Sequence, residues 1–506
     1  MSGLKKVPQA LIVLSVAALL FPSAHLFAMD TFMAGPRAAG MAGANVASVN
    51  DTSAQYYNPA AFGFFGKKDE SLLGNKEKQL SDNNDLGSKD WGVDISAGAG
   101  YRQHNKFGEY LDDLDKIDQD MLSTNGIQSQ GDLENLVSLV KDLDGLDDPG
   151  NAISANANGG LGIRVGSFGI GGHGYFQATG RVLSIDTINL GLRVNGADLS
   201  TDITAVAMPA DYTGYTPQVF DAAQRTQLLA TGLTATAIDR LDYYAYQEGL
   251  TSANVQGTVD ILASVSTQSG ASTLDDNTTT ALFTGFGVGE VPLTYGHAFN
   301  EHFSIGANLK FMKGRVYGNQ VIVFDNDSGE AVKKSDEQYE ETNNFGIDIG
   351  LMARMSMFNV GLIGRNLNAP KFDGPTIAFS TGTVTFDDVR IDPQVTFGVA
   401  FIPVDTFTLE VDIDLTENET TLSNYETRNV MIGLEWNVWH FLALRGGAYK
   451  NLAEDDIDWV YTAGLGVNMW AVRLDLAGAM SSTKERFDDD EVPKEAGASL
   501  QLSVDF

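Results

Sequence analysis

Charged side chains recur at every second position in several segments of this sequence. Glu410, Asp412 and Asp414 form one such set, and Arg473 with Asp475 forms another. Carboxylates held close together are the groups that acid–base catalysis or a divalent cation would use. Polar side chains that line the inside of a β-barrel have the same spacing, because alternate residues of a strand share one face. The surrounding residues decide between these two interpretations.

The sequence does not supply the rest of a catalytic site. Its six histidines are scattered, and it contains no Gly-x-Ser-x-Gly motif, no metal-spaced histidine pair and no phosphate-binding loop. Cysteine is absent, which excludes disulfides and thiolate metal sites. We therefore expect no enzyme, no catalytic residue, no metal and no cofactor. The net charge of −33 argues against a nucleic-acid partner, since proteins that bind nucleic acids present basic surfaces.

The residues between the charges are apolar, so these segments alternate as β-strands do. Phe407, Leu409 and Val411 are typical, and similar runs recur towards the C-terminus. A soluble β-sandwich also alternates, but it does not carry charges deep within strands of about ten residues, the length that crosses a bilayer at a tilt. We expect lipid on the apolar face and a polar lumen. The predicted lumen-lining charges are Lys310, Asp348, Glu410, Asp412, Asp414, Glu435, Arg445, Arg473 and Asp475.

Short and long connections alternate along the chain, which is typical of periplasmic turns and outer loops. The pattern predicts an all-β fold, a transmembrane antiparallel β-barrel of about fourteen strands. Its third segment is long enough to be two strands. Helical periodicity in two long outer loops predicts helical insertions at about 109–146 and 210–268. The predicted strands span about 91–103, 158–166, 169–194, 286–298, 302–317, 343–355, 358–366, 393–403, 405–416, 426–436, 440–449, 457–467, 470–481 and 494–506.

The two ends of the chain carry export signals. Residues 1–28 have a basic start and an apolar run that is shorter than the roughly 20 residues of a transmembrane helix, so they predict a signal peptide. We place cleavage after Ala28, with Ala24 as the alternative. Phe506 closes an alternating strand, which resembles the signal read by the outer-membrane insertion machinery. The expected location is the cell outer membrane, with lipid and that machinery as partners.

Residues 29–66 differ from the barrel sequence. They are rich in glycine and alanine and do not alternate, and Asn58-Pro59 sets a turn. These features fit either a compact plug or an N-terminal loop. A charged linker, 67–90, separates this segment from the barrel at 91–506.

A family resemblance favours the plug. The small residues of 35–44, the Asp-Thr-Ser-Ala step at 51–54 and the triplet Asn58, Pro59 and Ala60 resemble the hatch of FadL-type outer-membrane transporters for fatty acids and other hydrophobic compounds. The resemblance implies a fourteen-stranded barrel with a lumenal hatch. Segments 111–118, 411–418 and 444–451 are more similar to a sister group, the conjugal transfer TraF-like outer-membrane proteins. The helical insert at 195–285 matches no FadL-type feature.

Two functions follow from this resemblance. One is a FadL-like channel or transporter for small hydrophobic compounds, with the hatch as its gate and a hydrophobic ligand as partner. The alternative is a TraF-like envelope protein with a structural or assembly role in conjugation or secretion and no transport of its own. An apolar, aromatic pocket between hatch and lumen would favour the first, and a charged, fully occluded lumen would favour the second.

Changing Phe506 to serine should lower the amount of inserted barrel, because the residue closes the strand that the insertion machinery is expected to read. The measurement is the outer-membrane level of the protein and its faster migration on unheated than on heated gels. Changing the alternating but internal Phe407 to serine provides the comparison. A normal level of the Phe506 variant contradicts the prediction.

Overall fold

The computed structural model describes residues 30, 32–66 and 86, and residues 89–505 apart from 118, 268–275, 324–337, 380–381, 440, 470–471 and 488–489. The predicted signal peptide with Ala28, most of the linker and Phe506 lie outside the described residues.

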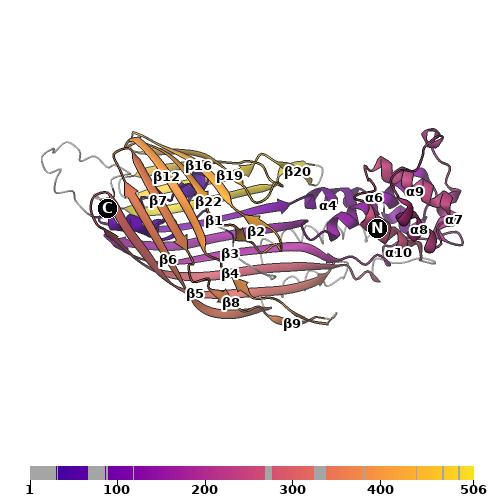
Figure 1. Ribbon diagram of the computed structural model, residues 1–506, viewed down its shortest axis with the longest axis horizontal. Helices are drawn as coiled ribbons and strands as arrows, with labels where there is room; N and C mark the ends of the chain where they lie inside the picture. Colours follow the sequence, from indigo (N-terminus) through magenta and orange to yellow (C-terminus); the bar gives the residue numbers. More distant parts are fainter. Residues whose placement is uncertain are drawn as a thin grey trace.

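Fourteen antiparallel strands close into one barrel, which confirms the predicted fold (Figure 1). The first strand pairs with the last, with Ile95 opposite Leu502. The barrel strands are β1 (Trp91–His104), β2 (Ala152–Val165), β3 (Phe168–Ser184), β4 (Thr280–Ala298), β5 (Phe303–Ile322), β6 (Tyr339–Arg354), β7 (Phe358–Arg365), β12 (Gln394–Val404), β13 (Phe407–Asp414), β16 (Asn429–Val438), β17 (Leu442–Asn451), β18 (Val460–Met469), β19 (Val472–Ser481) and β22 (Glu495–Asp505).

The two faces of these strands differ as the alternation predicts. Leu309, Val411 and Leu500 are exposed on the outside, whereas the charged members of the same strands are buried inside. Exposed aromatic side chains such as Phe168 and Trp439 lie at the end with the short turns, where an interfacial girdle is expected. A closed belt of exposed apolar side chains needs lipid around it, so the barrel spans a membrane.

The third strand is shorter than predicted. It ends at Ser184 rather than at 194, and it is a single strand. The Asp186 carboxylate accepts hydrogen bonds from the backbone N–H groups of Ile188, Asn189 and Thr278, and these contacts turn the chain away from the wall. Residues 188–194 do alternate, but Leu190 and Leu192 are buried in a helical domain instead. Strands β2 and β4 correspondingly begin about six residues earlier than predicted, at 152 and 280.

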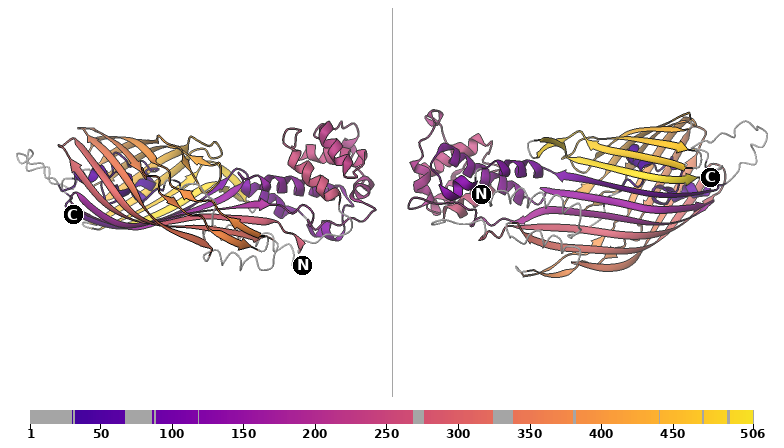
Figure 2. Two further views of the ribbon diagram at one scale, coloured as in Figure 1. Left: turned by 60° about the horizontal axis from the view of Figure 1, so that its bottom comes forward. Right: turned by 180° about the vertical axis from the view of Figure 1, so that it is seen from behind.

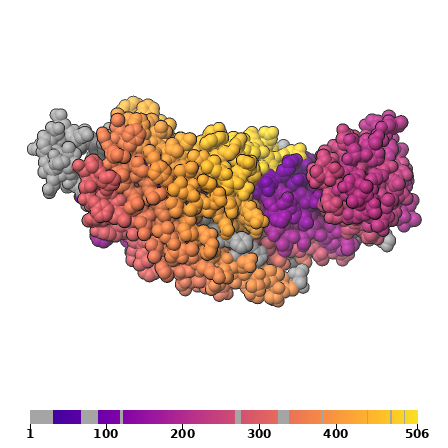
Figure 3. Space-filling view, in the orientation of Figure 1, coloured from indigo at the N-terminus to yellow at the C-terminus, as the bar shows by residue number. Residues whose placement is uncertain are grey.

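The two helical insertions form one domain with a common hydrophobic core at the outer end of the barrel (Figures 2 and 3). Leu136 and Val140 of the first insertion are buried in the same apolar cluster as Leu241 and Leu262 of the second. None of the helices among the described residues is long and apolar enough to cross a membrane. The helices are α4 (Phe107–Lys116), α5 (Gln119–Thr124), α6 (Gln130–Asp147), α7 (Leu199–Ala205), the 3-10 helix η4 (Ala210–Tyr212), α8 (Ala222–Ala230), α9 (Ala235–Gln247) and α10 (Gln256–Ser266).

Short hairpins occupy three further outer connections. Two nested pairs lie between β7 and β12, and one pair lies in each of the β13–β16 and β19–β22 connections. Their strands are β8 (Lys371–Phe372), β9 (Thr376–Phe379), β10 (Gly382–Thr385), β11 (Val389–Arg390), β14 (Asn418–Glu419), β15 (Glu426–Thr427), β20 (Lys484–Phe487) and β21 (Asp490–Pro493). The first two of these connections bend into the lumen.

The helical domain should lose stability as pH rises from about 4 to 7. Burial raises the pKa of Asp142 on α6 to about 7, although the Lys141 ammonium 3.3 Å away opposes the rise. In this range the folded domain therefore holds a proton that the unfolded chain has released, and this proton stabilises the folded state. The stabilisation is lost completely once the pH exceeds the raised pKa. Proteolysis rates of the domain at pH 5 and pH 8 measure the change. Asp142→Asn should flatten the profile, whereas Glu134→Gln on the exposed face of α6 should leave it. A profile that is unchanged in Asp142→Asn contradicts the assignment.

Candidate functional site

Residues 30 and 32–66, called the plug segment below, contact the inner faces of the barrel strands. This segment contains helices α2 (Pro36–Gly40) and α3 (Ala54–Tyr57) and the 3-10 helix η1 (Pro59–Gly63), and nearly all of its described residues are buried. Glycines on both sides allow close approach: a Cβ atom on Gly306 of β5 would overlap the backbone of Pro59, and one on Gly433 of β16 would overlap that of Met41. The small residues of the plug segment and of the strands that face it therefore let the two backbones pack closely.

Six charged side chains join the plug segment to the wall. In this charge chain, each member bonds the next with opposite sign: Arg37, Glu435, Arg445, Asp475, Arg473 and Asp51. The five N···O distances are 3.1, 2.7, 2.6, 2.7 and 2.9 Å in that order. Both ends belong to the plug segment, and the four middle members come from β16, β17 and β19. Removing one partner of a buried pair costs about 3–5 kcal/mol, because the other charge stays buried.

Two carboxylates of β13 hold the backbone of the plug segment. Asp412 Oδ2 accepts the N–H groups of Asn45 and Val46, at 2.8 and 2.9 Å. Glu410 Oε1 accepts the N–H group of Ala47 at 2.6 Å. The spacing that could have served acid–base chemistry thus satisfies backbone donors that have no partner in a helix or strand. Asp414 is set apart, since it accepts hydrogen bonds from other wall residues.

The other predicted lumen charges lie across the barrel. Lys310 of β5 bonds Asp348 at 3.1 Å and Glu290 at 3.4 Å. Asn308 donates to the carbonyl of Gln55 in the plug segment at 2.6 Å. All nine predicted charges are at most 8% exposed. These side chains are therefore packed against other protein groups, whereas the alternation alone predicted that they line a water-filled lumen.

The predicted triplet Asn58, Pro59 and Ala60 lies at the wall formed by β5 and β6. Asn58 Nδ2 donates to the carbonyls of Val46 and Leu351, each at 3.0 Å, and its Oδ1 accepts the N–H of Ala60 at 3.1 Å. The side chain also caps η1, whose first residue is Pro59. One asparagine thus connects two parts of the plug segment with the barrel.

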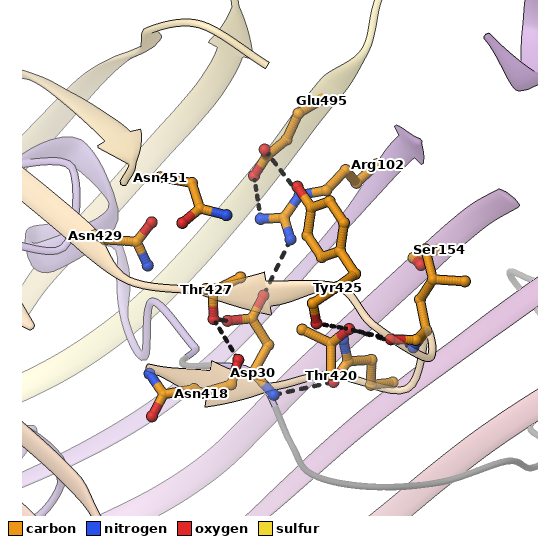
Figure 4. A network of polar contacts seen from close by, with 12 residues as sticks. Asp30, Arg102, Ser154, Asn418, Thr420, Tyr425, Thr427, Asn429, Asn451 and Glu495 are labelled. Atoms are coloured by element: carbon orange, nitrogen blue, oxygen red, sulfur yellow. Dashed lines mark hydrogen bonds and ion pairs between the residues drawn. The ribbon is translucent and has the colours of Figure 1, made fainter. Parts of the chain in front are cut away.

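The β13–β16 connection, residues 415–428, covers the plug segment from the outer side. This cover loop starts at one wall and reaches the opposite one, where Thr421 contacts the Thr179 hydroxyl of β3 at 2.7 Å. Asp30 lies beneath it and bonds both Thr427 Oγ1, at 2.7 Å, and Arg102, at 3.2 Å (Figure 4). The start of the plug segment is therefore tied to the loop above it.

The β7–β12 connection, residues 366–393, fills the side of the lumen next to β3, β4 and β5. In this wedge loop, Phe372 and Phe386 are almost fully buried. They belong to one apolar cluster with Phe286 and Val316 of the wall and Phe32 of the plug segment. The lumen thus has a charged side, held by the charge chain, and an aromatic side.

A cavity of ≈ 120 Å³ remains between the plug segment and strands β1, β19 and β22. Glycine and alanine of these strands, such as Gly98 and Ala477, leave the space open. The larger aromatic and methionine residues that line it are Phe32, Met33, Tyr56, Tyr57, Tyr101, Met431 and Tyr449. The charged residues that line it are Asp30, Arg102, Arg365, Asp414 and Glu495. Within the described part of the chain, no group of three metal-ligating side chains is close enough to hold a metal ion.

Sequence reasoning missed the residues that complete this site. Arg37 is the only base between residues 29 and 66, and Asp51 is one of two acids there, so each was a signal for a charged partner on the wall. Arg102 and Glu495 carried no such signal, because their partners on other segments lie far away in the sequence. The two inward loops carried none either, because loop sequences do not show which way they fold.

Comparison with known proteins gives a family and similar folds. The profile of the family described as F plasmid transfer operon, TraF, protein matches residues 55–414. No curated protein matches the sequence. Among solved structures, the Pseudomonas putida toluene transporter TodX is similar over 93% of this chain and 98% of its own, with 10% identity and a TM-score of 0.42. The monoaromatic hydrocarbon channel CymD is similar over 95% of this chain and 99% of its own, with 9% identity and a TM-score of 0.43. A Pseudomonas aeruginosa FadL homologue is similar over 96% of this chain and 99% of its own, with 11% identity and a TM-score of 0.41.

Replacing Glu410 and Asp412 by alanine should release the plug segment while the barrel stays inserted. The chain has no cysteine, so a cysteine introduced at the buried Ala47 reports accessibility to a maleimide. Losing several charge-assisted hydrogen bonds of about 1.5–3 kcal/mol each should raise the labelling rate by a factor of roughly ten or more. Alanines at Glu301 and Glu340, two exposed carboxylates outside the plug segment and the cover loop, should leave the rate unchanged. An equal rate in both double variants contradicts the anchoring role.

Proposed function

The chain belongs to the F plasmid transfer operon TraF protein family, and we propose that it is an outer-membrane barrel whose plug segment gates the passage of small, largely apolar compounds. The observation that carries this proposal is the position of the plug segment. It crosses the lumen, and it borders both the aromatic cluster and the cavity.

A route through the lumen needs space on the outer side of the plug segment. A second cavity, of ≈ 190 Å³, lies there between the wedge loop and the cover loop, with Leu282, Asp387 and Leu422 among its lining residues. A compound that enters from the outer mouth would meet this cavity first and the cavity beside the plug segment second. Aromatic side chains of the wedge loop lie along one side of that path.

The contacts of the plug segment suit a gate. Ion pairs and hydrogen bonds can be exchanged for bonds to water, so a buried pair adds little net stability relative to its hydrated state. A plug held in this way has a fixed position when closed and a limited free-energy difference from an open state. A plug held only by tightly packed large apolar side chains would expose much more apolar surface on opening.

The helical domain favours a second function. It lies outside the span of the barrel, has its own hydrophobic core, and is built from two long loops that a channel does not require. A domain in this position can bind a partner, as an assembly role in conjugation or secretion would need. Under that function the lumen would stay closed, so permeability separates the two proposals.

Changing Asn58 and Pro59 together to alanine should raise the permeability of the barrel. Three hydrogen bonds of about 1 kcal/mol each are lost, which increases an open population by up to roughly a hundredfold. The measurement is the swelling rate of liposomes that contain the purified protein, with small neutral solutes as probes. Asn300→Ala, on a short turn outside the lumen, is the matched control. Unchanged permeability in an inserted double variant contradicts the gate and favours the assembly function.

A further inference from the structure

Four of the five charged side chains around the cavity are held by neighbouring groups, either by ion pairs or by hydrogen bonds. Arg102 bonds Glu495 at 3.0 Å and Asp30 at 3.2 Å, so these three side chains satisfy one another. Asp414 accepts hydrogen bonds from the hydroxyl of Thr396 and the N–H group of Asn429, at 2.8 and 3.0 Å. The carboxylates that line the cavity are therefore already committed.

Arg365 is the fifth, and the described residues give it one hydrogen bond and no ion pair within 4.0 Å. It ends β7, is 5% exposed, and lines the cavity. Its Nε donates to Gln394 Oε1 at 3.4 Å, and its guanidinium lies over the Tyr56 ring, 4.6 Å from the centroid. No carboxylate among the described residues lies within 4.0 Å of it, and the same residues provide no hydrogen-bond acceptor for its two Nη groups.

A guanidinium that faces a cavity without an ion pair favours an anion. A planar guanidinium offers two parallel N–H donors, which match the two oxygens of a carboxylate. The anion would give the guanidinium a partner in direct contact, whereas the carboxylates of Asp414 and Asp348 act on it from more than 4.0 Å away. Asp30, Asp414 and Glu495 also border the space, and their negative charge disfavours a ligand that carries more than one negative charge.

The rest of the cavity sets the size and the character of the ligand. Phe32, Tyr56 and Tyr57 supply aromatic surface beside Arg365, and Met33 adds an adaptable apolar side chain. A volume of ≈ 120 Å³ is close to that of an engineered protein cavity that takes up benzene, about 150 Å³. The space is therefore about the size of a single ring.

We propose that the lumenal cavity binds a small organic monoanion with one apolar ring, whose charged group bonds Arg365 and whose ring contacts Tyr56 and Phe32. The inference deepens the proposed function, because it names the class of compound that occupies the path beside the plug segment. Binding itself needs no passage, so the two proposals can fail separately.

Titration calorimetry on the purified full-length mature barrel in detergent tests the proposal, with benzoate as the probe. Benzoate should bind the unchanged protein, and Arg365→Met should weaken binding at least tenfold, since a charge-assisted pair contributes about 1.5–3 kcal/mol. Benzyl alcohol, which has the ring without the charge, should bind no more tightly than benzoate binds Arg365→Met. Phthalate, with two negative charges, should bind more weakly than benzoate.

Two further variants keep the test decisive. Arg390→Met, at an exposed arginine of the wedge loop, should bind benzoate as the unchanged protein does. Arg365→Lys keeps the charge and should bind with an affinity between those of the unchanged protein and Arg365→Met. Each variant is first shown to be folded by its faster migration on unheated gels. The proposal is overturned if benzoate does not bind, if it binds Arg365→Met equally well, or if benzyl alcohol binds as tightly as benzoate. If benzoate binds as expected and the Asn58 and Pro59 variant is not permeable, only the gate is wrong.

Discussion

The pairing of buried charge determines how this barrel is filled. Its strands direct carboxylates and guanidinium groups into a lumen that is largely closed to solvent, where an unpaired charge costs several kcal/mol. The wall alone pairs Glu435 with Arg445 and Asp475 with Arg473, and Arg37 and Asp51 extend this set at both ends. The plug segment thus completes an arrangement that the wall begins, and its position follows from where the wall charges stand.

Charge fixes the position of the plug segment, but small residues make that position reachable. An N–H group must come within about 3 Å of Asp412, and this distance requires backbone against backbone. Glycine on the wall, as at Gly433, and glycine or alanine on the plug segment remove the side chains that would prevent it. The two kinds of residue therefore depend on each other. Without the small residues, the charged side chains could not reach the backbone of the plug segment. Without the charged side chains, the small residues would allow the plug segment to pack in many registers.

The barrel could be predicted from the sequence because its signals are local. Alternation such as that of Phe407 to Ile413 depends only on neighbours along the chain, and it gave the strand number and most boundaries. The same signal failed at residues 188–194, where Leu190 and Leu192 alternate but pack in the helical domain. The partners of Glu410 and Asp412 lie more than 360 residues away in the sequence, and no local pattern contains that information. The sequence therefore allowed us to predict that these charged side chains face the lumen, but not that they contact the plug segment.

The same need for polar partners bears on Arg365, which has no ion pair within 4.0 Å among the described residues. Arg102 sits in the cavity wall as Arg365 does, yet it has two carboxylates, one from the wall and one from the plug segment. Arg365 could have been matched in the same way, because Asp414 stands on a nearby strand, but that carboxylate is held by Thr396 and the backbone of Asn429. Arg365 therefore faces the cavity without a carboxylate in direct contact, and the proposed anion would supply that contact. The plug segment and the occupant of the cavity would then be bound by the same physical means, and a ligand that reaches Arg365 competes for the space against which the plug segment rests.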